Sequence, residues 1–252
     1  GEGVDTITAG NGNNTIDGGD GADVIVAGTG NNTITNSAGN ATITAGTGNN
    51  TVTNTAGNST ITLGNGTNTV NLTAGNSTVV TGSGADDINI TAGNNDITTG
   101  AGNDTISLGS GNDTVDAGTG TDTVDFSVDR GTWAGAITDA ETVTATYTGS
   151  ATIDAAGLAG YTTLNVTASG STSATTLKNI GDATINLTDD SVEGGGDGDI
   201  EAMTIDTTDD ATITVNLGAN QEAATAAAAD LASLAITDAS AVTLKVSGGG
   251  FG

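Results

Sequence analysis

The stretch GSGNDTVDA, residues 109–117, decides the fold. Its two glycines and its Asn-Asp pair are typical of a tight turn, because glycine accepts positive φ and Asn and Asp bond to their own backbone. The Thr-Val-Asp that follows favours a short strand. A looser stretch, TAGNSTITL at residues 55–63, keeps the same order but has Ser59 where the first has Asp113. One turn and one strand therefore form a nine-residue unit that recurs along the chain.

Residues 1–126 divide into fourteen consecutive nonapeptides without an insertion. Gly occupies the third position and Ile or Val the seventh in all fourteen, and Thr occupies the sixth in eleven. We expect the Ile or Val to point inward and the flanking threonines to point outward. One inward residue in nine cannot form a core within a repeat, so stacked copies must bury a continuous line of Ile and Val. The sequence predicts an all-β protein with a parallel β-solenoid.

This pattern resembles the repeats-in-toxin (RTX) family, whose hemolysin-type repeat is G-G-x-G-x-D-x-U-x, with U a large apolar residue. The family Asp falls on the fifth position here, whereas the family's first Gly falls on the ninth, which is mostly another residue, such as Ala9, Leu63 or Phe126. The resemblance implies a right-handed β-roll with two nonapeptides per coil. It also implies that several calcium ions lie in the turns, held by Asp carboxylates and turn carbonyls.

Two nonapeptides per coil place the odd and even repeats on opposite edges of the roll. At the fifth position, the aspartates gather toward both ends of the odd edge and toward one end of the even edge. They are Asp5, Asp23 and Asp113 on the odd edge and Asp86, Asp104 and Asp122 on the even edge. The coils between them carry Asn, Ser or Ala at this position.

These six aspartates are the predicted calcium ligands, because calcium prefers several hard oxygens. Neighbouring coils would bring Asp86 to Asp104, Asp104 to Asp122, and Asp5 to Asp23 at about the 4.8 Å strand spacing. Stacked carboxylates repel without a cation, so we expect these coils to need calcium in order to fold. We expect the middle coils to be metal-free, with Asn side chains bonded from coil to coil. The alternative is that the aspartates only form turns.

Other acids lie outside this pattern. We expect the acids at other repeat positions to be solvated surface charge: Asp17, Asp20, Asp87, Asp96, Asp116 and Asp125. In the second half, the Gly-rich stretch DDSVEGGGDGDIE at 189–201 contains Asp197 and Asp199, which are candidate calcium ligands. Its spacing fits neither an EF-hand loop nor the nonapeptide, and a solvated acidic loop is the alternative.

The nonapeptide rhythm stops after Phe126, so we expect a β-roll domain at 1–126 and a second domain at 127–252. Short Thr-rich strands continue there at irregular spacing, which favours a less regular β-solenoid or β-rich region. The Ala-rich stretch at 220–234 predicts one short helix. The phrases TLNVTASGST (163–172) and ATINLTDDS (183–191) resemble the calcium-dependent surface-layer (S-layer) proteins of Gram-negative bacteria.

Charge and composition exclude several classes of function. The chain has 30 acidic against 3 basic residues and a net charge of −27, so it has no basic footprint for nucleic acid and an anionic membrane would repel it. It contains no Cys and no His, which removes the usual zinc sites, thiol and imidazole chemistry, and disulfides. No apolar run reaches the roughly 18 residues of a membrane span, so we expect no membrane insertion. We also expect no enzymatic activity.

The leading hypothesis is a structural extracellular protein that folds on calcium and self-assembles into a bacterial surface layer or filament. The resemblance implies type I secretion of the unfolded chain and folding at the cell surface. Its partners would be further copies of itself, with cell-surface polysaccharide bound through another part of the parent chain. One alternative is an RTX spacer or secretion module of a larger toxin, protease or adhesin. Another is a calcium-dependent ice-binding solenoid with ranked Thr and Asn.

Overall fold

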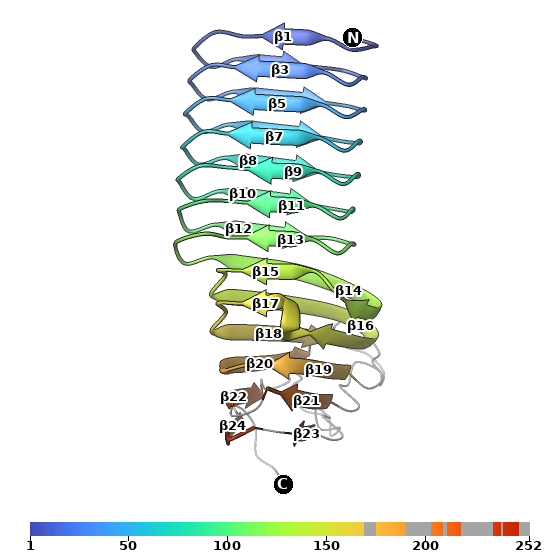
Figure 1. The fold of residues 1–252 in the computed structure, drawn as a ribbon, viewed down its shortest axis with the longest axis vertical. Coiled ribbons are helices and arrows are strands. Elements are labelled where there is room, and N and C mark those ends of the chain that lie inside the picture. Colours follow the sequence, from blue (N-terminus) through green and yellow to red (C-terminus); the bar gives the residue numbers. More distant parts are fainter. Residues whose placement is uncertain (169–174, 190–202, 209–210, 218–233, 238, 247–252) are drawn as a thin grey trace, which may run out of the picture. The chain divides into compact units, whose positions relative to one another are not determined.

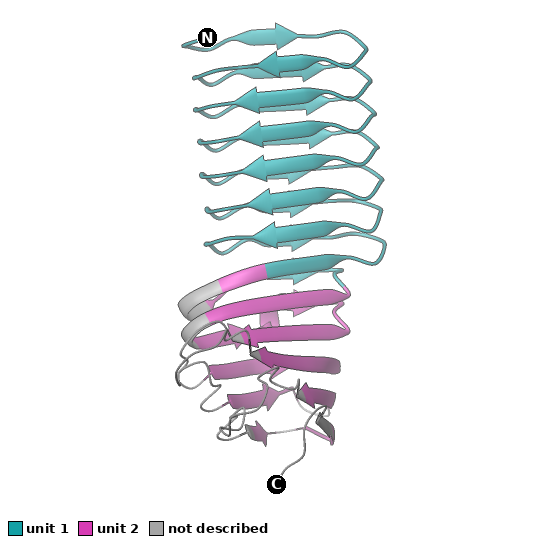
Figure 2. Ribbon diagram, turned by 180° about the vertical axis from the view of Figure 1, so that it is seen from behind, with its two compact units in different colours: residues 1–125, 135–140 teal, residues 126–134, 141–252 magenta. Residues whose placement is uncertain are grey.

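The computed structural model describes residues 1–168, 175–189, 203–208, 211–217, 234–237 and 239–246. The chain forms parallel β-solenoid coils that divide into two compact units (Figure 2). The first comprises Gly1–Asp125 and Gly135–Ala140, and the second comprises Phe126–Ala134 and Glu141–Gly252. The all-β parallel solenoid predicted from the sequence is confirmed.

In the first unit, each nonapeptide contributes one short strand, and alternate strands pair within two parallel sheets (Figure 1). The odd sheet contains β1 (Thr6–Thr8), β3 (Val24–Ala27), β5 (Thr42–Ala45), β7 (Thr60–Leu63), β9 (Thr78–Val80), β11 (Asp96–Thr98), β13 (Thr114–Asp116) and β15 (Ala136–Thr138). The even sheet contains β2 (Thr15–Asp17), β4 (Thr33–Asn36), β6 (Thr51–Asn54), β8 (Thr69–Leu72), β10 (Asp87–Ile90) and β12 (Thr105–Leu108). β14 (Thr123–Trp133) begins in this unit and ends in the second.

The register of the sheets confirms two nonapeptides per coil. Ile7 pairs with Ile25 in the odd sheet, and Val70 pairs with Ile88 in the even sheet, a step of eighteen residues in each case. Every coil therefore places the same repeat position above its counterpart in the next coil. Each line of equivalent residues becomes a column that runs through the unit.

Three positions of the nonapeptide face inward, and the expectation of one inward residue in nine was wrong. The seventh-position residues from Ile16 onward are buried, as predicted. The fifth and ninth positions are buried as well, for example Asn50 and Leu63. Strand alternation explains this result, because residues two apart share a face. The inward fifth position brings the aspartates into the interior of the turns.

The third-position glycines let neighbouring coils approach closely. Gly21 and Gly120 have φ of 146° and 156°, values that side-chain-bearing residues rarely adopt. A Cβ atom on Gly21 would clash with the Gly3 carbonyl oxygen, and one on Gly120 would clash with the Gly102 carbonyl oxygen. The invariant glycine is therefore required both by its conformation and by its contact with the next coil.

The second unit has longer and less regular coils, as predicted. Its strands are β16 (Thr142–Asp154), β17 (Leu158–Ala159), β18 (Thr163–Ala168), β19 (Thr175–Ile180), β20 (Ala183–Asp189), β21 (Met203–Thr207), β22 (Thr212–Leu217), β23 (Leu234–Thr237) and β24 (Ala241–Val246). Leu164 pairs with Ile185, 21 residues on, whereas Ile185 pairs with Val215, 30 residues on. A short 3₁₀ helix, η1 (Ala155–Gly157), precedes β17. The helix predicted at 220–234 lies outside the described residues, apart from Leu234, which begins β23.

Candidate calcium sites

The fifth-position aspartates lie in columns on the inner side of the turns. Five of them are at most 2% exposed: Asp23, Asp86, Asp104, Asp113 and Asp122. Asp5, in the first coil, is half-buried. Buried carboxylates need a counter-charge or hydrogen-bond donors, because their desolvation is costly. The partners of each carboxylate oxygen therefore decide what these turns can bind.

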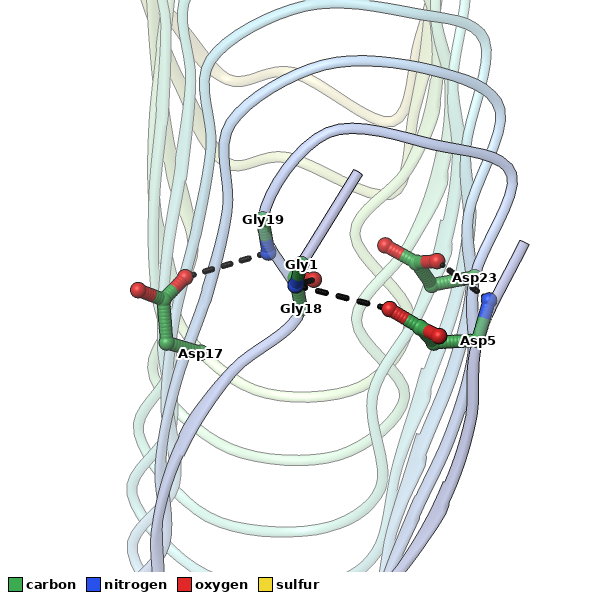
Figure 3. A network of polar contacts seen from close by, with 6 residues as sticks. All are labelled: Gly1, Asp5, Asp17, Gly18, Gly19 and Asp23. Carbon is green, nitrogen blue, oxygen red and sulfur yellow. Dashed lines mark hydrogen bonds and ion pairs between the residues drawn. The ribbon is translucent and has the colours of Figure 1, made fainter. Parts of the chain in front are cut away.

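One oxygen of each buried carboxylate accepts a hydrogen bond from the coil before it. Asp104 Oδ1 accepts from the Asp86 amide at 2.8 Å, and Asp122 Oδ1 accepts from the Asp104 amide at 2.7 Å. Asp23 Oδ1 accepts from the Asp5 amide at 2.8 Å (Figure 3). The structure thus places all three predicted aspartate pairs in adjacent coils.

The second carboxylate oxygen has no donor in four of these turns. Oδ2 of Asp23, Asp86, Asp104 and Asp113 is buried and has no hydrogen-bond partner among the described residues. Thr81 lies beside Asp86, but its hydroxyl donates to the Thr99 carbonyl oxygen at 2.8 Å and leaves Oδ2 without a donor.

The electrostatics of two of these turns, those of Asp86 and Asp113, disfavour the charged carboxylate. Burial, with a smaller contribution from the charge of Asp104, raises the pKa of Asp86 against the lowering effect of its hydrogen bonds. Burial likewise raises the pKa of Asp113, although Asn95 donates to it. A bound cation would reverse this effect, because it favours the ionised form.

Asparagine at the same position shows which hydrogen-bond donor the aspartate turns lack. Asn32 Nδ2 donates to the carbonyl oxygens of Gly28 and Gly30 at 3.1 and 2.9 Å, and to Asn50 Oδ1 at 2.9 Å. Asn14, Asn50 and Asn68 repeat this arrangement with their own turn glycines and with the next coil. One amide group therefore satisfies three oxygens.

Asp has the shape of Asn but carries an oxygen in place of this amide. Asn68 donates its backbone N–H to Asp86 Oδ1 at 2.7 Å, as Asn50 donates to Asn68 Oδ1. Asp86 Oδ2 thus replaces Nδ2 at a position where the asparagine turns have a donor. Several oxygens without a donor between them are the ligand set that calcium prefers. The residues of the even-edge turns fit a calcium ion on this observation.

The middle coils satisfy their turns without a cation. On the even edge the asparagine column provides the donors described above. On the odd edge the Ala41 amide donates to Ser59 Oγ, and the Ser59 amide donates to Ser77 Oγ, each at 3.1 Å. The Ser77 amide then donates to Asn95 Oδ1 at 2.8 Å. These contacts provide the physical basis for the predicted metal-free zone.

A backbone difference accompanies some of the aspartates and was not predicted. The first-position glycines Gly19, Gly100 and Gly118 have φ of 84°, 90° and 82°. They open the turns that contain Asp23, Asp104 and Asp122. The first-position glycines of the asparagine turns, such as Gly28 and Gly46, do not have positive φ among the described residues. The nonapeptide pattern carries no signal for this, because Gly occupies the first position in both kinds of turn.

The first coil contains a positive group beside a predicted ligand. The ammonium group of Gly1 lies 3.4 Å from Asp5 Oδ2 and donates to the Gly18 carbonyl oxygen at 2.8 Å (Figure 3).

The remaining acids do not form metal sites by themselves. Asp17, Asp20, Asp87, Asp96 and Asp116 are exposed and Asp125 is partly exposed. Across the part of the chain that the structure describes, no three acidic side chains converge on one point. Asp197 and Asp199 lie outside the described residues. Any calcium site in the roll must therefore take main-chain or amide oxygens as well as carboxylates.

The family comparison agrees with this geometry. The family model for the RTX calcium-binding nonapeptide repeat (4 copies) matches residues 1–34, 35–66, 44–79, 62–89 and 90–124. The matches extend over all but the last two residues of the fourteen predicted nonapeptides. Searches of curated proteins and of solved structures found no match.

Proposed function

Because residues 1–124 form an RTX-type β-roll, we propose that this chain is a structural extracellular protein that folds on calcium and assembles with copies of itself into a bacterial surface layer or filament. The nonapeptide half is a calcium-binding structural repeat domain. The proposal of extracellular assembly rests in addition on the family and on the exposed threonine rows of the strands.

The single observation that carries the calcium dependence is the set of buried carboxylate oxygens without donors, in Asp23, Asp86, Asp104 and Asp113. In the absence of a cation these oxygens destabilise the folded coils. Calcium binds only the folded arrangement, so its binding free energy adds to folding stability. A chain with this property stays unfolded at low calcium and folds at high calcium.

Regular outward faces support self-assembly. In β5 and β7, Thr42 pairs with Thr60 and Thr44 with Thr62, and all four side chains are exposed. The hydroxyl rows of these two coils present the same surface, on which another copy can pack in register. Exposed acids such as Asp96 add negative charge, which calcium between copies would neutralise.

An extracellular location is supported by the family, because RTX repeats are typical of secreted bacterial proteins. Among the described residues, no helix has the length and apolar character that a membrane crossing requires.

The test combines circular dichroism with electron microscopy of the purified chain. We expect β-structure to appear on addition of calcium, to disappear with EGTA, and to be followed by sheets or filaments at higher protein concentration. If EGTA changes neither the spectrum nor the assembly, the proposed calcium dependence of folding and assembly is wrong.

A spacer or secretion module of a larger protein is the second candidate, because the family match covers the repeats alone. Such a module would fold on calcium and stay monomeric. A calcium-folded chain that remains monomeric by analytical ultracentrifugation would favour this candidate over assembly.

A further inference from the structure

A second column of residues faces the interior of the first unit beside the odd-edge turns, and it is polar only in part. It is formed by the ninth position of the even repeats, at the end of each even strand. The residues along it are Gly18, Asn36, Asn54, Leu72, Ile90 and Leu108. The column is apolar from Leu72 onward, but its first three members are a glycine and two buried asparagines. The asparagines need an explanation, because an apolar residue fills the same place in later coils.

The side-chain oxygen of Asn36 faces the same space as the free oxygen of Asp23. A Cβ atom built on Gly18 would lie 2.9 Å from Asn36 Oδ1 and 3.0 Å from Asp23 Oδ2. The two oxygens are therefore no further apart than the sum of these distances. Both side chains are at most 1% exposed, and neither oxygen has a hydrogen-bond partner among the described residues.

The structure places the Asn36 amide with its oxygen toward Gly18. Its Nδ2 donates to Asn54 Oδ1 at 3.0 Å and to the Ala38 carbonyl oxygen at 3.4 Å. The Gly1 ammonium does not fill the space between the oxygens, because it contacts Gly18 O and Asp5 Oδ2. Two acceptors thus share one enclosed space without a donor between them.

We propose that Asn36 Oδ1 and Asp23 Oδ2 together bind a divalent cation inside the first coils of the roll. Calcium takes oxygen ligands at about 2.3–2.6 Å, so one ion can join two oxygens that lie up to about 5 Å apart. The Gly18 Cβ position, at 2.9 and 3.0 Å from the two oxygens, is close to these ligand distances. Asp23 supplies the charge, Asn36 supplies a neutral oxygen, and Gly18 provides the room. Ile25 Cδ1 lies 3.0 Å from the same Cβ position and makes one wall of the site apolar.

The other buried aspartates have no carboxamide oxygen at the corresponding place. The residue that corresponds to Asn36 is Thr99 for Asp86 and Ala117 for Asp104. The Thr99 hydroxyl donates to the Ala117 carbonyl oxygen at 2.9 Å, and Ala117 has no polar side-chain atom. The Asp23 site is therefore distinct in its ligands, and Asn36 distinguishes it from the turns of the even edge.

Calcium titration calorimetry of the full chain tests the proposal, which rests on the proposed calcium binding. Asn36→Leu introduces the residue that the chain itself has at Leu72 and Leu108. We expect this variant to lose one ion from the stoichiometry or to bind that ion about 10- to 100-fold more weakly. Asn36→Asp keeps an oxygen at this place and adds charge, so we expect it to keep the full stoichiometry with tighter binding.

Asp104→Asn is the matched reference, because it removes a carboxylate from the even edge and leaves Asn36 in place. If Asp104→Asn weakens calcium binding while both Asn36 variants bind as the unchanged chain does, the Asn36 site is wrong and the calcium-folded roll stands. If the unchanged chain binds no calcium at all, the proposed function is wrong and this site is wrong with it. Should Asn36→Leu fail to fold, an Asn36→Asp chain with unaltered affinity would by itself overturn the proposal.

Discussion

Replacing Asp86 by Asn should make the calcium-free chain more stable and the calcium-loaded chain less stable. Asp86 is the first aspartate after the four asparagines of the even edge, and its Oδ1 already accepts hydrogen bonds from the Asn68 amide and side chain. Asn at this position would extend the asparagine column by one coil. Its Nδ2 would donate to the carbonyl oxygens of Gly82 and Gly84 and to Asp104 Oδ1, as Asn68 donates to its own turn.

The magnitude follows from those three contacts. A hydrogen bond contributes about 0.5–1.5 kcal/mol net, so three contribute about 2–4 kcal/mol to the free energy of unfolding without calcium. The substitution also removes the charge repulsion between Asp86 and Asp104. With calcium at about 1,000 times its dissociation constant, the unchanged chain gains about 4.1 kcal/mol per site, and the variant loses that gain at this turn. This loss exceeds the about 2–4 kcal/mol that the three hydrogen bonds contribute to the variant.

Urea unfolding in saturating calcium measures the second effect, and folding induced by an osmolyte such as TMAO in EGTA measures the first, each followed by circular dichroism. Asp87→Asn is the control, because Asp87 is the next residue, is exposed at the start of β10, and its loss removes the same charge without touching the turn. The sign of the effect should invert between the two conditions for Asp86→Asn and should stay near zero for Asp87→Asn. A variant that is less stable than the unchanged chain in EGTA would refute the reasoning.

Three further predictions concern the same turns. Asn50→Asp should create a donor-free oxygen in a middle coil and destabilise the EGTA-treated chain by about 2–4 kcal/mol, with calcium restoring stability in urea unfolding. Without calcium, the raised pKa values of Asp86 and Asp113 should make the roll more stable at acid pH. This stability is complete below the pKa of the unfolded chain and is lost as pH rises through the raised pKa of the folded chain. In an Asp86→Asn/Asp113→Asn chain, the free energy of unfolding should therefore depend less on pH. Gly120→Ala should lower the free energy of unfolding by about 2 kcal/mol or more, because alanine is strained at the Gly120 φ of 156° and the alanine Cβ would clash with Gly102. An unchanged melting temperature in thermal unfolding would contradict this.

Sequence alone could predict the repeating part of the fold, because the Ile or Val at every seventh position marks the strand and the step of eighteen follows from two repeats per coil. The aspartate columns were also predictable, because a spacing of eighteen puts Asp86 beside Asp104. The inward ninth position was missed, since only Ile and Val were assigned to the core. Strand alternation would have revealed it at Leu63 and Leu72.

The rest of the site could be identified only from the three-dimensional structure. Asn36 and Asp23 are thirteen residues apart and lie in different repeats, so no spacing rule connects them. They meet because Gly18 lacks a side chain, and only the stacked coils show that Gly18 lies beside both of them. The same limit applies to Gly19, whose positive φ separates it from Gly28 although both open a nonapeptide.

The asparagine column also makes the length of the roll adjustable. Each coil contacts its neighbours through the same eighteen-residue register, so stability in such a stack is close to a sum over coils and their interfaces. Inserting or deleting one asparagine coil would change the rod by about 4.8 Å and leave the number of ions unchanged. The middle coils, which we predict to bind no ion, would then act as a spacer of selectable length, and the acidic coils on either side would set how much calcium the roll requires.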